Sequence, residues 1–317
     1  MAVDLDQFSN APIYRATVPC SQALEDLQQL GQLDAHREKK QRQASLVGGS
    51  TLVAGILGLL VGFPGLQGEG IGEVLGWGGV GLILVGLVAL IQSSRYQQLN
   101  LENRRYELAS RLVGLLQADI APDEPVTLEL DLRPETHSDK YQNESRTPSG
   151  WKVKHYLDPW LSLQARLLDG THLRLEMTAR VQLRSRTKTN ARGKTKHKSR
   201  QLSDALLRVR LRVKPERYQH LERLGAKAEG AMQLLKGTQL KDLTVEADRV
   251  DMTLHLDSPW SAGNEPRPSP GSGPGNRSPG PTPLNGQRVV AMALLSLYQL
   301  LNLSRALDKK AVHSRAG

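Results

Sequence analysis

Cysteine and aromatic residues are scarce in this chain of 317 residues. Cys20 is the only cysteine, which excludes an intrachain disulfide and a metal site built from several thiolates of one chain. Aromatic residues make up 4% of the sequence, which leaves little material for a surface that stacks single-stranded nucleic acid. The first 45 residues contain no apolar run long enough for a secretory signal.

Motifs that carry recognisable chemistry are also missing. The eight histidines are scattered and form neither a helical pair nor a His/Glu metal spacing. No phosphate-binding glycine loop follows a strand pattern, and no nucleophile elbow is present. The sequence therefore predicts no catalytic residue, no cofactor and no metal site, and it favours a binding or scaffolding protein. An enzyme with a site assembled from distant residues is left open.

Charged residues are absent from two long stretches. Residues 44–68 and 74–94 contain no Asp, Glu, Lys or Arg. Each stretch holds about 18 mostly apolar positions, enough for a helix that crosses a hydrocarbon core. The other interpretation is a pair of buried helices in a soluble protein, but such helices seldom stay apolar on every side. We therefore predict a transmembrane hairpin with spans at about 46–64 and 74–92.

Glycine is concentrated in the predicted spans: fourteen of the 29 glycines lie between Gly48 and Gly86. Small residues let helix backbones approach closely in lipid. Two stripes with four-residue spacing are the predicted packing surfaces: Ser50, Ala54, Gly58 and Gly62 on the first helix, and Gly72 and Gly76 on the second. They favour packing within one chain, and self-association into a homo-oligomer is the alternative. An oligomer that forms a solute or ion pathway is a further possibility, although neither span contains an ionisable residue.

Basic residues flank the two spans on one side only. Arg37, Lys39, Lys40 and Arg42 precede the first span, and Arg95, Arg104 and Arg105 follow the second. Residues 63–73, which connect the spans, contain no Lys or Arg. Because positive residues stay on the cytoplasmic side, both termini are predicted to be cytoplasmic. Helical patterns in residues 21–44 and 95–118 predict a stalk that continues the hairpin for up to about 35 Å beyond the membrane.

Apolar and polar residues begin to alternate, with a period of two residues, near residue 125. Alternation marks residues 126–133, 151–158, 160–168, 172–186, 205–214 and 243–257 as strands. The last run changes parity near Asp248 and Arg249, which predicts a β-bulge, and residues 215–237 predict one or two helices. The fold class is therefore an α+β membrane protein: a transmembrane hairpin with its stalk (21–118) and a cytoplasmic antiparallel β-sheet domain (119–260).

The two ends of the chain carry weaker signals. Residues 1–20 are treated as an N-terminal segment. Residues 261–286 are rich in Pro, Gly and Ser, which predicts a linker. Residues 287–310 have a helical pattern, but their uncharged run of 16 residues is short for a span. A helix docked on the β-domain, on the membrane surface or on a partner is therefore favoured over a third span.

Acidic residues are missing from residues 186–200, which contain seven Lys or Arg. A three-residue loop with Gly193 at positive φ would keep the apolar and basic faces of the two flanking strands in register. This register pairs Lys188 with Lys196, Arg186 with Lys198 and Arg184 with Arg200. Like charges directly opposite each other are destabilising, so we expect the outer hairpin to fray alone and to become ordered when an anion binds.

The net charge of +10 and this basic run point to an anionic partner. The candidate anion-binding residues are Arg184, Arg186, Lys188, Arg192, Lys194, Lys196, Lys198 and Arg200. Near a cytoplasmic leaflet each Lys or Arg gains about 1 kcal/mol from acidic lipids, so membrane lipid headgroups or an acidic protein are the favoured partners. Nucleic acid is the alternative. The basic residues of the two flanking strands have even numbers. Lys152, Lys154, Arg166 and the aromatic Tyr156 on neighbouring strands are also even-numbered and are predicted to share the basic face.

Overall fold

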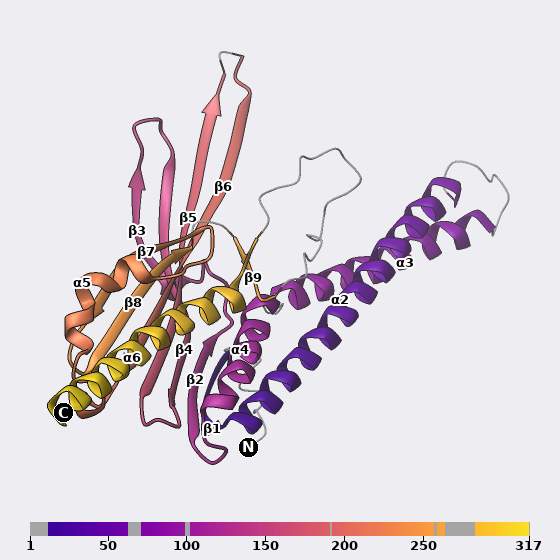
Figure 1. Ribbon diagram of the computed structural model, residues 1–317. Coiled ribbons are helices and arrows are strands. Elements are labelled where there is room, and N and C mark those ends of the chain that lie inside the picture. Colours follow the sequence, from indigo (N-terminus) through magenta and orange to yellow (C-terminus); the bar gives the residue numbers. More distant parts are fainter. Residues whose placement is uncertain are drawn as a thin grey trace. The chain divides into compact units, whose positions relative to one another are not determined.

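The computed structural model describes residues 12–62, 71–98, 102–190, 192–256, 259–263 and 283–316. The chain divides into two compact units, a sheet unit (residues 1–28 and 102–317) and a helical unit (residues 29–101). Helix α2, Cys20–Gly62, begins in the first and continues into the second. The protein is thus a mixed α+β structure with an antiparallel sheet, as the sequence predicts (Figure 1).

The sheet unit is built on eight strands in the order β1-β2-β4-β5-β6-β8-β7, with β3 paired to β4 outside this path. The strands are β1 (Ile13–Pro19), β2 (Pro125–Asp131), β3 (Tyr141–Arg146), β4 (Lys152–Arg166), β5 (His172–Thr189), β6 (Thr195–Arg212), β7 (Thr238–Val245) and β8 (Arg249–Leu256). Strands β5 and β6 have 18 residues each, and their far ends project beyond the neighbouring strands (Figure 1).

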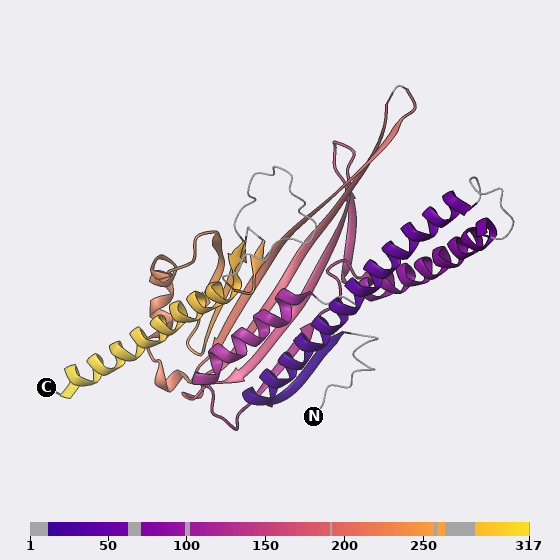
Figure 2. The ribbon, with the colours of Figure 1, turned by 90° about the vertical axis from the view of Figure 1, so that its right-hand side faces the viewer.

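Helices of the sheet unit cover one face of this sheet, and no described helix of this unit covers the other, which is called the bare face (Figure 2). They are α4 (Asn103–Leu116), α5 (Leu221–Ala231) and α6 (Gly286–Ala316). Apolar residues at helical spacing explain the docking of α6, since Val290, Ala293 and Leu297 are fully buried. The helix expected over 287–310 therefore packs on the β-domain.

Two of the expected strands form one. Residues 151–158 and 160–168 belong to β4, which continues through an irregularity between Pro159 and Leu161. This bulge reverses the parity of the strand. As a result, Arg166 lies opposite His172 on the bare face, whereas Lys152, Lys154 and Tyr156 lie opposite odd-numbered residues of β5 on the helix-covered face. The prediction that these three residues lie on the basic face was wrong.

The parity change near Asp248 is a turn and not a bulge. Residues 243–257 do not form one strand, because Val245 pairs with Val250 across the β7–β8 hairpin. The turn is closed by the Glu246 N–H, which donates to the Arg249 carbonyl at 2.8 Å. Residues 246–249 contain no glycine or asparagine that would signal a hairpin here.

Strand β1 was not predicted. Its seven residues pair with β2 along their whole length, from Ile13 opposite Asp131 to Pro19 opposite Pro125. The Tyr14 hydroxyl donates to Asp26 at 2.8 Å and so ties the strand to the first turns of α2. The partner strand lies far along the chain, and a short run near a terminus carries no signal of such pairing.

The ends of the predicted linker lie together. Trp260–Ser261 (β9) and Leu284–Asn285 (β10) form a short parallel pair. Residues 264–282 between them lie outside the described part of the chain. Because β10 leads directly into α6, the segment is anchored at both ends to the sheet unit.

The helical unit consists of α2 from residue 29 onward and α3 (Ile71–Gln98). The expected helix over 95–118 is interrupted: α3 ends at Gln98, and α4 begins at Asn103 and belongs to the sheet unit. Leu108 and Leu112 of α4 are fully buried there. Residues 102–118, predicted as part of the stalk, therefore belong to the sheet unit, and the helical unit ends at residue 101.

Glycines bring α2 and α3 into backbone contact, and Gly58 is the one described member of the predicted stripe at this contact, where a Cβ added to Gly79 would lie 3.2 Å from its carbonyl carbon. A Cβ added to Gly55 would lie 2.8 Å from the carbonyl oxygen of Gly79, and one added to Gly86 would lie 3.1 Å from that of Gly48. Ser50 and Ala54 are exposed and Gly58 is half-buried, so the four-residue stripe does not form the main contact. The seven-residue spacing of Gly48 and Gly55 keeps these two on one face, while Ser50 and Ala54 point away. The surroundings of Gly62, Gly72 and Gly76, the other predicted packing residues, are outside what the structure describes.

From Leu46 to Ile91, the described surface of the helical unit is largely apolar. Side chains with more than 55% of their surface exposed are Leu46, Val53, Leu57, Leu60, Trp77, Leu84, Val85, Val88 and Ile91. By length and apolarity, two helices of the described residues can cross a membrane, within Cys20–Val61 and Gly286–Leu307, and Trp77–Ile91 is a shorter apolar stretch. Only 11% of the apolar window in α2 is buried, against 50% in α6, which fits the docking of α6 on the sheet.

Candidate functional site: a basic ribbon

The bare face of the sheet, called here the outer face, carries the even-numbered residues of β5 and β6. Register places Arg174 opposite Arg210 and Glu176 opposite Arg208. The odd-numbered residues between them, such as Leu175 and Val209, are fully buried on the other face. Alternation along each strand therefore produces one apolar and one strongly charged surface.

Near the middle of the sheet, acids on the outer face neutralise the basic residues. The Arg180 guanidinium donates to Asp204 at 2.7 Å. Both Arg208 and Arg210 donate to Asp251, at 2.9 and 3.0 Å from their Nε atoms. Burial alone would raise the pKa of Asp251, but the hydrogen bonds and charges of the two guanidinium groups outweigh it and hold the pKa below its usual value.

The far end of the β5–β6 hairpin has the predicted register. Lys188 lies opposite Lys196, Arg186 opposite Lys198 and Arg184 opposite Arg200. Residues 184–200 are called the basic ribbon below.

The turn of the basic ribbon is held by Asn190 and Gly193. The Asn190 N–H donates to the Lys194 carbonyl at 3.1 Å, and the Gly193 N–H donates to the Asn190 carbonyl at 3.0 Å. The Asn190 side chain also accepts from the N–H groups of Arg192 and Lys194, at 3.1 and 2.9 Å. Gly193 has a φ of +74°, a conformation that favours glycine. The predicted loop is thus confirmed.

Cations of the basic ribbon have no acidic partner among the described residues. Within the described part of the chain, no carboxylate oxygen lies within 4.0 Å of the basic groups of Arg184, Arg186, Lys188, Arg192, Lys194, Lys196, Lys198 or Arg200. Arg184 instead donates to the Gln182 side chain at 2.7 Å. Arg184 and Arg186 are half-buried, and the other six residues are exposed. The structure therefore brings all eight predicted residues onto one hairpin, where their like charges remain uncompensated.

The second face of the ribbon is polar but uncharged. Thr187 and the His197 ring nitrogen lie 2.9 Å apart, and the hydroxyls of Thr189 and Thr195 lie 3.0 Å apart. These cross-strand hydrogen bonds offset part of the repulsion between the cations. No Phe, Tyr or Trp occurs between positions 184 and 200, so His197 is the one ring in this segment on which a base could stack.

A buried charge cluster lies under the opposite face, and sequence reasoning missed it. Arg105 of α4 donates to Asp158 of β4 at 2.7 Å, and Lys140 lies 2.8 Å from the other oxygen of Asp158. Glu135 lies 2.7 Å from Arg104 at the edge of the cluster. Burial and the neighbouring Glu102 carboxylate raise the pKa of Glu135. These groups pair with one another, which indicates a structural role.

Two tryptophans extend this cluster to β9. The rings of Trp160 and Trp260 are stacked with centroids 5.3 Å apart and planes 7° apart. The guanidinium of Arg104 lies 4.6 Å from the Trp260 ring centre and that of Arg105 lies 5.3 Å from the Trp160 ring centre. The cluster therefore fastens α4 and β9 to the sheet.

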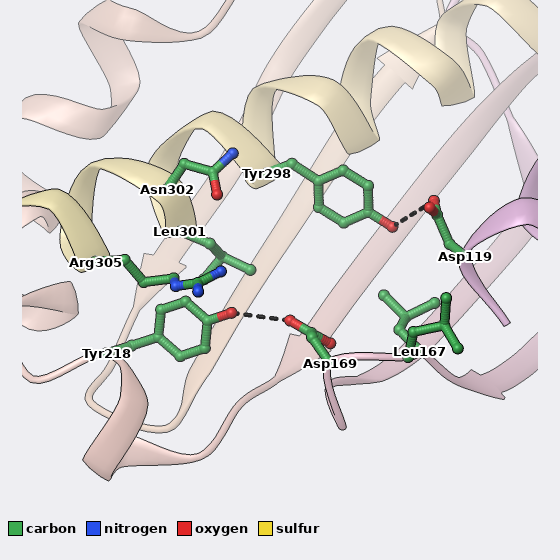
Figure 3. Close-up of a pocket in the computed structure, with 9 residues that line it drawn as sticks. Asp119, Leu167, Asp169, Tyr218, Tyr298, Leu301, Asn302 and Arg305 are labelled. Carbon is green, nitrogen blue, oxygen red and sulfur yellow. Dashed lines mark hydrogen bonds between the residues drawn. The ribbon is translucent and has the colours of Figure 1, made fainter. Parts of the chain in front are cut away.

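A hollow of about 210 Å³ lies where α6 crosses the end of the sheet, between the turn after β4 and the segment before α5 (Figure 3). The Tyr218 hydroxyl donates to Asp169 at 2.9 Å, and the Tyr298 hydroxyl lies 3.5 Å from Asp119. Burial, reinforced by the Asp169 carboxylate, raises the pKa of Tyr218. Because these polar groups are directed at one another, we assign the hollow no ligand.

Comparison of the chain with protein-family models, with curated proteins and with solved structures finds no match. Among the residues that the structure describes, no group of three or more His, Cys, Asp or Glu side chains is placed to hold a metal ion. The basic ribbon is thus the candidate site on physical grounds alone.

Proposed function

We propose that this protein is a membrane-anchored binding or scaffolding protein whose basic ribbon docks on an anionic partner. The α2–α3 hairpin anchors the chain with two spans, and both termini and the sheet unit lie on the cytoplasmic side. The sheet holds the ribbon away from its own acids so that the cations stay available.

The membrane part of this proposal rests on the exposed apolar surface of the helical unit. Fourteen large apolar side chains between Leu46 and Ile91 are each at least 40% exposed. Burying such side chains is worth about 1.5–3 kcal/mol each, so water is a poor solvent for this surface. Orientation is inferred from the basic residues that flank the spans and from their absence in the connecting turn.

The binding part rests on the contrast between two sets of cations on the same two strands. Arg180, Arg208 and Arg210 have carboxylates at hydrogen-bond distance, whereas the cations of the basic ribbon have none among the described residues. A fold that neutralises one set and leaves the other open presents a site for an external anion. This contrast is the single observation that carries the proposal.

Binding can be measured with the purified full chain in nanodiscs of neutral lipid. The probes are fluorescent polyglutamate and vesicles of phosphatidylcholine with or without phosphatidylserine. We expect anion binding that weakens as salt is raised. The ribbon variant replaces Lys188, Lys194, Lys196 and Lys198 with Gln, and it should bind at least about tenfold more weakly, which corresponds to about 1.4 kcal/mol.

A matched control removes the same charge elsewhere. Arg223, Lys236, Lys241 and Arg288 are exposed, and replacing these four with Gln lowers the net charge as much as the ribbon variant does. The control should bind like the wild type. Equal losses in both variants would mean that only net charge matters, and the ribbon would no longer be the site.

A further inference from the structure

The basic ribbon has a free strand edge as well as free charges. Strand β6 pairs with β8 only from Ala205 onward, where Ala205 lies opposite Leu256. On the side away from β5, residues 195–203 have no strand partner among the described residues. All of them except Leu202 are exposed. This segment is called the free β6 edge.

The hydrogen-bond pattern shows which backbone groups face outward. The Asn190 N–H donates to Lys194, and in an antiparallel ladder such hydrogen-bonded pairs recur at every second residue. Lys196, Lys198 and Arg200 therefore direct their N–H and C=O groups toward β5. Further along the same strand, the Val213 N–H donates to the Asp248 carbonyl on the β8 side at 2.8 Å, which fits this parity. Thr195, His197, Ser199, Gln201 and Ser203 hence direct their backbone groups toward the free edge.

Side chains and backbone together define what the edge accepts. A strand added antiparallel to the free β6 edge would form hydrogen bonds with residues such as His197 and Ser199. Its alternate residues would lie opposite Lys196, Lys198 and Arg200 in non-hydrogen-bonded pairs, where Cα atoms are only about 4.5 Å apart. Carboxylates at those positions would meet the ribbon cations across the strands.

We propose that the free β6 edge accepts an extended acidic segment of a partner protein as an additional strand. The segment carries Glu or Asp at alternate positions. This inference rests on the proposed function and names its partner class: a protein strand, bound through backbone hydrogen bonds and charge.

Three features favour a strand over other anions. An isolated two-stranded ribbon is marginally stable, and a third strand would support it. Opposite charges on the third strand would also offset the repulsion between pairs such as Lys188 and Lys196. Finally, lysines along an open edge disfavour edge-to-edge pairing between two copies of the chain. The same charges favour a strand that carries acidic residues.

N-methylated peptides test this inference without altering the protein. The parent peptide alternates Glu and Thr over about ten residues, enough to cover the free β6 edge at about 3.4 Å per residue. In one derivative the Thr nitrogens are methylated, which removes the donors that face β6. In the other the Glu nitrogens are methylated, and these point away from β6 in the predicted register.

Binding to the full chain in neutral nanodiscs is measured by fluorescence anisotropy. We expect the parent and the Glu-methylated peptide to bind within a few-fold of each other, and the Thr-methylated peptide to bind at least about thirtyfold more weakly, a difference of about 2 kcal/mol. Equal binding of both derivatives would overturn strand addition, as would binding of phosphatidylserine vesicles without any peptide binding. Either result leaves anion binding by the basic ribbon in place, because that proposal is tested separately by the four-lysine ribbon variant and its matched control.

Discussion

The guanidinium of Arg105 lies against the carboxylate of Asp158, with Nη2 2.7 Å from Oδ2 and both side chains excluded from solvent. Arg105 also donates to the Asp131 carbonyl at 2.8 Å. These contacts connect α4 to β4, which pairs with β5 of the long β5–β6 hairpin, and to β2 on the other side of β4. The position of the hairpin thus depends on a buried ion pair on the opposite face of the sheet.

Removing one member of this pair should destabilise the sheet unit strongly. Asp158→Asn removes the buried carboxylate that both Arg105 and Lys140 contact, and breaking a buried ion pair from one side typically costs about 3–5 kcal/mol. Denaturant unfolding of the full chain in detergent, followed by far-UV circular dichroism, measures the loss. Arg15→Gln is the control, because it breaks an ion pair with Glu129 in which the side chains are 68% and 47% exposed. Such pairs contribute about 0–1 kcal/mol, so equal losses would contradict the role of the cluster.

Much of the basic ribbon was predictable from the sequence, because strand alternation and Gly193 together leave one register for the hairpin. The Arg105–Asp158 pair was not, since a single Arg in a helical pattern and a single Asp in a strand resemble surface residues. The β7–β8 turn lacked glycine, and the bulge after Pro159 reversed a parity that the sequence left unmarked. In each case the deciding contact lies outside the local pattern.

The contact between α2 and α3 provides a second prediction. Gly55→Ala should separate the helices, since its Cβ would lie 2.7 Å from an Ile83 side-chain carbon and 2.8 Å from the Gly79 carbonyl oxygen. Overpacking of this kind costs about 1–3 kcal/mol. Gly49→Ala is the matched control on the same helix, because no atom lies within 4 Å of its added Cβ. Unfolding of the hairpin by sodium dodecyl sulfate in mixed micelles should need less detergent for Gly55→Ala alone.

Acid should weaken the outer face of the sheet. The pKa values of Asp204 and Asp251 are lowered, because hydrogen bonds and charges from neighbouring arginines outweigh the effect of burial. Their contribution is therefore complete above the unfolded pKa of about 3.9 and is lost as the pH falls through the lower folded value. Asp251→Asn should cost about 1–3 kcal/mol at pH 7 and much less at pH 3.

The exposed Asp123 provides the comparison for this pH series. Asp123→Asn should leave the free energy of unfolding unchanged at both pH values. If Asp251→Asn were equally destabilising at neutral and acidic pH, lost packing and not charge would explain the effect. Unfolding in urea at each pH gives the measurement.

Cys20 should be inert in the folded protein. The residue is 4% exposed, and burial raises the pKa of its thiol, so the reactive thiolate is both rare and inaccessible. Maleimide labelling at pH 8 should be at least about tenfold slower in the native chain than in urea. A cysteine introduced at the exposed Thr187 should react rapidly under native conditions, and equal rates at both sites would show that Cys20 is accessible.

The central claim is that the α2–α3 hairpin lies in lipid. Alkaline carbonate extraction of membranes from cells that express the full chain tests it most directly, because this treatment releases peripheral proteins and leaves spanning helices in the bilayer. The account predicts that the protein stays in the membrane pellet and dissolves only when detergent is added. Recovery of folded protein from the carbonate supernatant would contradict it.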